Sequence, residues 1–194
     1  MRILSSIGLV VVFLSLSNCA VSQEYDLDLA VLPLAQEDRE QATIVYVDEE
    51  GAFQVLRSGS NKLFCIADEP GDDRFSLECH PNSLMTYLER KEKRSLSEYR
   101  DELDQGIDED IQSGALDFPV GARSYFISGR MNSGDKVPDS ARVWQEIAVP
   151  FASEEQTGLP TEDAGASPWL MGEDSHGAHI MIGYRTVAWE RLFD

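Results

Sequence analysis

Two of the three histidines in the chain, His176 and His179, lie three residues apart. Imidazole nitrogens bind zinc in a tetrahedral site, and Glu173, Asp174 or His80 would have to supply the further ligands. The H-E-x-x-H spacing that places two ligands on one helical turn is absent. In an extended chain, residues three apart point to opposite faces. We therefore interpret His176 as a loop residue and His179 as a hydrogen-bonded strand residue, and a metal-dependent enzyme that uses both is the alternative function.

The chain has three cysteines, Cys19, Cys65 and Cys79. Cys79 stands beside His80, and a thiol next to a base can act as a nucleophile, but adjacent residues rarely orient one side chain onto the other. The pair Cys65 and Cys79 instead predicts a disulfide, since an even number of cysteines is typical of oxidising compartments. It would close a loop of about 15 residues, worth on the order of 3 kcal/mol. Two free thiols or a metal pair are the alternatives.

Residues 1–22 have the pattern of a signal peptide. Arg2 gives a positive start, and an apolar run of about 10–12 residues follows, which is too short to span a bilayer of about 30 Å and typical of an export signal. Two cleavage sites are open: a lipobox-like end at Cys19, or a cut after Ser22. Lipidation of Cys19 would tether the protein to a membrane through acyl chains. Either cut leaves residues 23–194 as a single globular domain outside the cytoplasm.

The formal net charge is −19, from 35 acidic and 16 basic residues. Nucleic acids and anionic lipid surfaces require a positive face, so neither is expected as a partner. We interpret the charge as a source of solubility, because the acidic residues form no calcium-loop pattern. Since 42% of the residues are hydrophobic, the chain can still bury a core.

The N-terminal half predicts three strands after a loosely structured lead-in at residues 23–42. Residues 42–47 and 52–57 are rich in β-branched and aromatic side chains and flank an acidic turn that ends in Gly51, which is typical of a hairpin. Residues 62–66 predict a third strand, so these segments would form a small meander.

Helices are predicted next. Pro81 and Asn82 are start signals, and this helix is expected to end or to leave the core where the chain becomes charged on all sides, at residues 89–94. Ser95 and Glu98 fit a capping box for a second helix, whose apolar face carries Tyr99, Leu103, Ile107 and Ile111 before Gly114 ends it.

The C-terminal half predicts strands at residues 122–127, 142–149 and 178–184, with a long loop over residues 152–177. The expected fold class is α+β, an antiparallel sheet with one or two covering helices in one disulfide-bonded domain. Trp169, Leu170 and Met171 place apolar side chains within the acidic loop. They predict either a lip that binds a partner or an apolar ligand, or a segment that pins the loop to the core.

Several short motifs follow one another in a recognisable order along the mature chain. They are Leu56-Arg57-Ser58-Gly59-Ser60-Asn61, Cys65, Cys79-His80, Val149-Pro150-Phe151-Ala152, Thr157-Gly158-Leu159-Pro160, Pro168-Trp169-Leu170-Met171 and Ala178-His179-Ile180-Met181-Ile182. As a set they resemble an uncharacterised family of small exported bacterial proteins. The resemblance covers most of the mature chain and implies a single exported domain, with no activity attached.

Together these features predict an exported acidic domain, in the periplasm or tethered to the outer membrane or cell envelope. Its expected role is a non-enzymatic binding or interaction module without a cofactor, and its partner an envelope protein or a small ligand. Contact with a membrane would come only through a lipid anchor on Cys19.

Overall fold

The computed structural model describes residues 25–71, 73–132 and 134–192. The predicted signal peptide, with Cys19 and both cleavage sites, lies outside them. The strands are β1 (Thr43–Val47), β2 (Phe53–Arg57), β3 (Leu63–Ile66), β4 (Arg74–Pro81), β5 (Arg123–Arg130), β6 (Ser140–Ala148), β7 (Trp169–Met171) and β8 (His179–Ala188). The helical elements are α1 (Leu27–Ala30), α2 (Gln36–Arg39), η1 (Asn82–Leu84), α3 (Met85–Ser95), α4 (Arg100–Ser113), α5 (Glu154–Thr157) and η2 (Trp189–Arg191).

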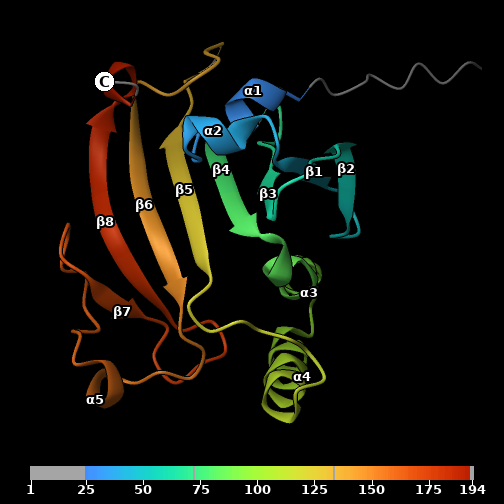
Figure 1. Ribbon diagram of the computed structural model, residues 1–194, viewed down its shortest axis with the longest axis vertical. Coiled ribbons are helices and arrows are strands. Elements are labelled where there is room, and N and C mark those ends of the chain that lie inside the picture. Colours follow the sequence, from blue (N-terminus) through green and yellow to red (C-terminus); the bar gives the residue numbers. More distant parts are fainter. Residues whose placement is uncertain (1–24, 72, 133, 193–194) are drawn as a thin grey trace, which may run out of the picture.

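All eight strands belong to one sheet in the order β2-β1-β3-β4-β5-β6-β8-β7 (Figure 1). Every neighbouring pair is antiparallel except β1 and β3, which are parallel. This confirms the predicted α+β class and the hairpin of β1 and β2. The expected meander is wrong, because β3 crosses over to the other side of β1 instead of pairing with β2.

One face of the central strands β4, β5 and β6 is apolar and packs under α1, η2 and the residues beside them. Phe75, Leu77, Ile127 and Ala141 are buried there against a second set of apolar side chains. That set is Leu29, Leu32, Met131, Val143, Trp189 and Leu192. Since side chains alternate along a strand, the opposite face of the same strands carries a different set of residues, which forms the pocket described below.

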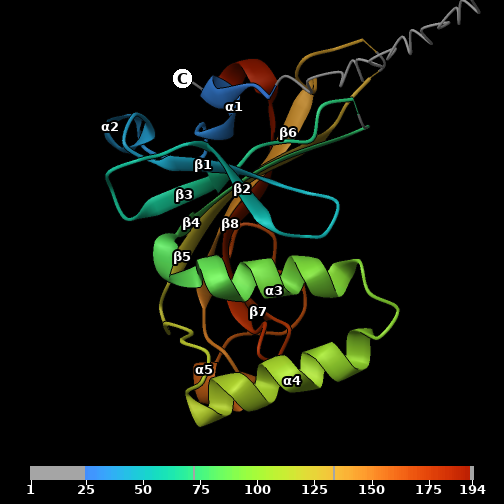
Figure 2. The same cartoon turned by 90° about the vertical axis from the view of Figure 1, so that its right-hand side faces the viewer.

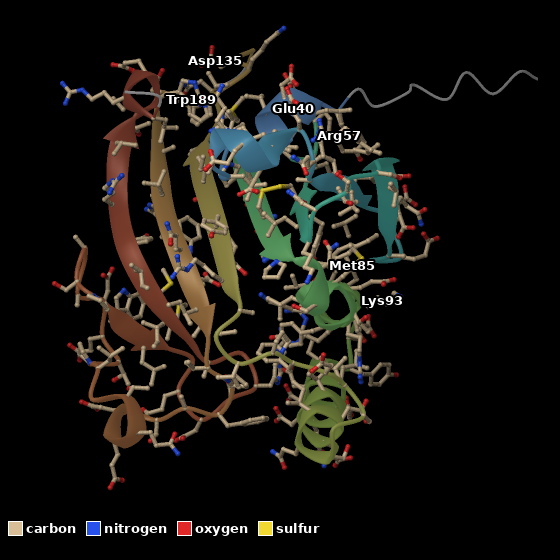
Figure 3. All side chains as sticks on the ribbon, viewed as in Figure 1. Glu40, Arg57, Met85, Lys93, Asp135 and Trp189 are labelled. Atoms are coloured by element: carbon tan, nitrogen blue, oxygen red, sulfur yellow. A yellow bond between two sulfur atoms is a disulfide. The ribbon has the colours of Figure 1, made fainter. Side chains whose placement is uncertain are left out.

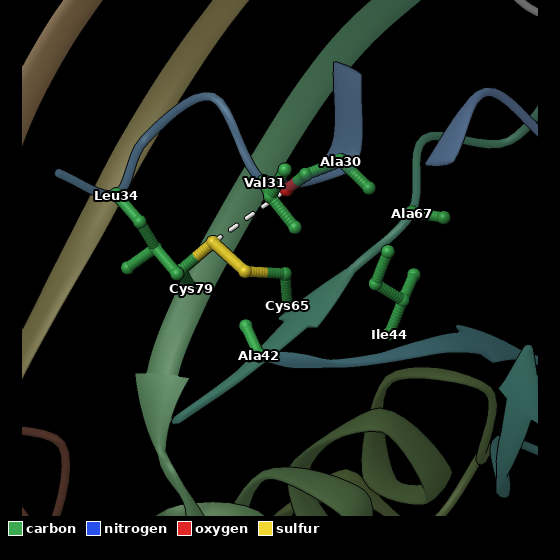
Figure 4. Close-up of a cluster of buried hydrophobic side chains, with 8 residues drawn as sticks. All are labelled: Ala30, Val31, Leu34, Ala42, Ile44, Cys65, Ala67 and Cys79. Carbon is green, nitrogen blue, oxygen red and sulfur yellow. Dashed lines mark hydrogen bonds between the residues drawn. A yellow bond between two sulfur atoms is a disulfide. The ribbon is translucent and has the colours of Figure 1, made fainter. Parts of the chain in front are cut away.

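Residues 25–42 are more ordered than the sequence predicts. Ala30, Val31 and Leu34 are buried around the disulfide that joins Cys65 to Cys79 on the paired strands β3 and β4 (Figure 4). Cys79 Sγ also lies 3.5 Å from the carbonyl oxygen of Ala30. The disulfide prediction is confirmed, and the docking of α1 follows from the apolar surface that the two sulfur atoms help to form.

Helices α3 and α4 lie side by side at one end of the sheet (Figure 2). Tyr87 and Leu88 of α3 and Ile107 of α4 are buried in one cluster with Val45 and Phe64 of the sheet. Of the predicted apolar face of α4, Ile107 and Ile111 pack into this cluster, whereas Tyr99 and Leu103 are exposed. The end of α4 at Gly114, in the left-handed conformation, is confirmed.

One predicted helix boundary is wrong. The first helix continues to Ser95, but none of residues 89–94 is buried, so it leaves the core there instead of ending. Arg90 and Arg94 in this segment form ion pairs with Asp110 and Asp104 of α4. The second begins only at Arg100, with Tyr99 at its N-cap position and no side-chain cap. The capping box expected from Ser95 and Glu98 therefore does not form.

The strand β4 and two elements within the long loop were not predicted. β4 precedes the first helix, and α5 and β7 fall inside residues 152–177. Helix α5 has the capping box of Ser153 and Gln156, while β7 is only three residues long and pairs with β8.

Replacing Cys65 and Cys79 together by Ala should lower the free energy of unfolding by about 3 kcal/mol, because the cross-link restricts the unfolded chain. Guanidinium unfolding followed by circular dichroism measures it. The wild-type chain under reductant is the control, since it loses the cross-link but keeps both sulfur atoms. Equal midpoints for the variant and the oxidised wild type would contradict the expectation.

Candidate functional site

A pocket of about 740 Å³ lies between the second face of the sheet, helices α3 and α4, and residues 175–178. Its floor comes from β4, β5, β6 and β8, and Trp169 and Met171 of β7 lie at its rim. Pockets that bind small molecules have volumes of roughly 300–1,000 Å³ and mix apolar walls with a few polar groups. The size and position of this pocket therefore fit a small-molecule site.

Strand register sets the order of the side chains on the floor. Ser124 pairs with Glu146, Glu146 with Met181, and Met181 with Trp169, so one row of side chains crosses β5, β6, β8 and β7. His80 of β4 extends this row, since its Nδ1 lies 2.8 Å from Ser124 Oγ. Residues distant in sequence therefore line one surface because cross-strand neighbours share a face.

The adjacent row is aromatic. The rings of Phe126 and Trp144 stack with centroids 4.9 Å apart and planes within 3° of parallel. Tyr184 meets Trp144 edge-on at 5.9 Å, and His80 meets Phe126 edge-on at 5.4 Å. Aromatic contacts thus run without a break from β4 to β8 across the floor.

A bulge in β8 places Tyr184 on this face. Between Val143 and Gln145 the pairing of β6 with β8 shifts by one residue, and Gly183 has a φ of +67°. A glycine adopts this left-handed conformation without steric cost, and the extra residue of a bulge re-aims the side chains beyond it. Tyr184 therefore reaches the pocket beside Trp144.

Tyr87 of α3 covers the pocket from the helix side. Its ring contacts Phe118 at 4.3 Å and His176 at 5.8 Å. Burial, and then the negative charges of Asp104 and Glu146, raises the pKa of Tyr87 to about 12. The side of the pocket that Tyr87 covers therefore combines burial with nearby negative charge.

His80 is only 2% exposed and lies between two polar neighbours. Besides Ser124 on Nδ1, its Nε2 is 3.4 Å from Glu78 Oε2. Burial acts to raise the pKa of Glu78, but the hydrogen bonding and charge of His80 outweigh it, so the pKa lies below its usual value. Glu78 is consequently held as a carboxylate at the floor of the pocket.

Both histidines singled out from the sequence line the pocket. His176 Nδ1 lies 2.8 Å from Asp108 Oδ1, and His179 Nδ1 lies 2.7 Å from the carbonyl oxygen of Gly177. His179 is a strand residue with a hydrogen bond, as interpreted. Among the residues that the structure describes, no group of three or more His, Cys, Asp or Glu side chains could hold a metal ion, so no third ligand joins this pair.

Trp169 and Leu170 are buried, at 9% and 0% exposed, whereas Met171 is 46% exposed. β7 thus attaches the long loop to the sheet through its first two residues, as the pinning interpretation expects. Trp169 also lines the pocket, so the same residue could contact a ligand.

Unpaired polar atoms gather at this pocket. In the described part of the chain, five buried side-chain polar atoms lack a hydrogen-bond partner, and four of them belong to residues of the pocket wall. These four are His80 Nε2, Arg94 Nε, Trp169 Nε1 and His179 Nε2. Two of them still face carboxylates, since His80 Nε2 lies 3.4 Å from Glu78 and His179 Nε2 lies 3.6 Å from Glu146. Each of the four atoms is buried within the wall, so a bound molecule would contact its neighbours rather than the atom itself.

No protein-family model matches the chain, and neither a curated protein nor a solved structure is significantly similar to it. None of the helices in the described ranges is long and apolar enough to cross a membrane. The assignment of a function therefore depends on the site itself.

Replacing Trp169 by Ala should lower the free energy of unfolding by about 3–5 kcal/mol, because a buried aromatic side chain leaves a cavity. Thermal and urea unfolding measure it. Met171→Ala is the matched control in the same strand and should change the stability by no more than about 0.5 kcal/mol. An unchanged stability for Trp169→Ala would show that β7 does not pin the loop.

The stability of the protein should also depend on Glu78 in acid. Because its folded pKa lies below the unfolded value, its carboxylate stabilises the fold above the unfolded pKa, and that contribution is lost as the pH falls through the folded pKa. Its side chain is 35% exposed, so solvent limits the effect to about 1 kcal/mol. Urea unfolding between pH 3 and pH 6, roughly the range of carboxyl titration, should show a shallower pH dependence for Glu78→Gln than for the wild type, and identical curves would refute this.

Proposed function

We propose that this chain is an exported, non-enzymatic ligand-binding module, and that the pocket between the central strands and α3 and α4 takes a small molecule. The observation that carries the proposal is the pocket of about 740 Å³, whose wall joins a continuous row of aromatic rings to the polar side chains of Glu78, His80, Glu146 and His179. An apolar and aromatic enclosure with a few convergent polar groups is the usual form of such a site.

A binding role fits the pocket better than hydrolysis. Ser124, His80 and Glu78 have the composition of a serine–histidine–carboxylate triad. The hydrogen bond between Ser124 and His80 is also a feature of such triads, but Ser124 is only 5% exposed. A nucleophile must present its oxygen to the substrate carbonyl, so this chain of polar groups is better suited to holding the floor in place.

Export is part of the proposal because of the signal-peptide pattern in residues 1–22. The disulfide between Cys65 and Cys79 is compatible with an oxidising compartment. Within such a compartment the module would bind either a free small ligand or a small group presented by an envelope component.

The three tryptophans give a direct test. Trp144 and Trp169 line the pocket, whereas Trp189 lies in η2, at the opposite end of the sheet from β7 (Figures 1 and 3). A library of small fragments should contain compounds that shift the indole N–H signals of Trp144 and Trp169 in proton–nitrogen NMR spectra and leave that of Trp189 in place. Assignment uses Trp→Phe variants at each position. If no fragment shifts the two pocket signals selectively, the proposed function is wrong.

A further inference from the structure

We propose that the pocket selects small organic cations, with the ligand ammonium group seated against Glu146 and its apolar body against the aromatic row of the floor. The inference rests on the proposed function and assigns the chemical class of the ligand. It follows from the hydrogen-bonding roles of a few atoms and from the distribution of charge around them.

Glu146 offers an acceptor on the wall of the pocket. The carbonyl oxygen of Gly177 can only accept, so Nδ1 of His179 carries the proton in that hydrogen bond. In the neutral ring, Nε2 carries no proton, so although it lies 3.6 Å from Glu146 Oε1 it donates nothing to that carboxylate. A ligand N–H group would supply the missing donor to Glu146.

Trp144 fixes the carboxylate at this point. Its indole Nε1 donates a 2.8 Å hydrogen bond to Glu146 Oε1. The same indole stacks on Phe126, which limits the movement of its ring. The acceptor is therefore held in position before a ligand arrives, and this lowers the entropic cost of binding.

The carboxylates of the floor lack fixed counter-ions. Among the described residues, no Lys or Arg lies at ion-pair distance from Glu78 or Glu146, and only the rings of His80 and His179 lie that close. A charge in a poorly hydrated site is costly unless it is paired. An ammonium ligand would supply that pair for Glu146.

The arginines and the lysine of the pocket do not neutralise Glu146. Arg94 is neutralised by its ion pair with Asp104. Arg142 lies four residues before Glu146 on β6, which places their backbones about 13 Å apart along the strand. Lys91 lies on α3, where its charge acts on Glu78. The part of the pocket around Glu146 therefore keeps a negative charge that no Lys or Arg pairs. That charge is one cause of the raised pKa of Tyr87.

Two further features favour a cation. Aromatic faces attract ammonium groups by about 0.5–2 kcal/mol, and Tyr87, Trp144, Trp169 and Tyr184 all line the pocket. In addition, a protein with a net charge of −19 raises the local concentration of cations and steers them toward acidic concave surfaces.

The test uses three probes of one shape and different charge: 2-phenylethylamine, 2-phenylethanol and 3-phenylpropanoate. Isothermal titration calorimetry of the mature chain gives their affinities, and the indole signals of Trp144 and Trp169 report the place of binding. The amine should bind at least about tenfold more tightly than the alcohol, and the carboxylate more weakly than either.

Glu146→Gln should weaken binding of the amine by about tenfold and leave that of the alcohol unchanged. Glutamine retains an oxygen that can accept from Trp144, so the fold should be preserved, and its melting temperature checks this. Glu155→Gln is the matched control, because it removes one negative charge at an exposed position of α5 outside the pocket. It should leave all three affinities unchanged.

Two results would overturn the inference in distinguishable ways. If the alcohol or the carboxylate binds at the two pocket tryptophans as tightly as the amine, the preference for cations is wrong and the ligand-binding function stands. If none of the probes binds at millimolar concentration, the inference fails, and the fragment screen then decides separately whether the pocket binds any small molecule.

Discussion

The alternation of side chains along β4, β5, β6 and β8 is the constraint on which the rest of this structure depends. One set of alternate residues must be buried, and Phe75, Leu77 and Ile127 meet this need under α1 and η2. The other set is then fixed on the opposite face by the same pleat. A slip of one residue in any strand would exchange the two sets, so the requirement for a core also determines which polar groups line the pocket.

The two halves of the sheet are stabilised by different means. In the half that contains β3 and β4, a disulfide and an apolar cluster hold the N-terminal segment, while at the opposite edge β7 anchors a long acidic loop through Trp169 and Leu170. Helices α3 and α4 are joined to each other by two arginine–aspartate pairs that lie partly exposed. Such pairs contribute little by themselves, so the buried contacts of Tyr87 and Ile107 hold this cover over the pocket.

Features of the fold that depend on local pattern were predictable from the sequence. The β1–β2 hairpin, the end of α4 at Gly114 and the three C-terminal strands follow from alternation, turn residues and helical spacing. The parallel pairing of β1 with β3 was not predictable, because it is set by contacts between distant segments. β7 is too short to show periodicity, and its pairing with β8 is again a tertiary contact.

The same distinction applies to the site. His176 and His179 were singled out from their spacing, and both reach the pocket. Glu78, Trp144 and Glu146 were not, because each is an ordinary polar or aromatic residue in a predicted or overlooked strand. Only the register of β4, β5, β6 and β8 brings them together, and no short motif encodes that register. A search for strands in which polar and apolar residues alternate around an aromatic could have drawn attention to Trp144 and Glu146 of β6.

The bulge at Gly183 has a consequence for how this protein could diverge. A bulge strengthens the local twist of its strand, so the curl of the sheet beneath the pocket is built into the backbone. The course of the main chain beneath the floor is then fixed by the bulge, while the chemistry of the pocket is set by side chains that stand on the floor. Replacing Glu146 by Gln would change which molecule is preferred while leaving the main chain and the bulk of the side chain nearly unchanged, so selectivity could diverge among descendants that share one backbone.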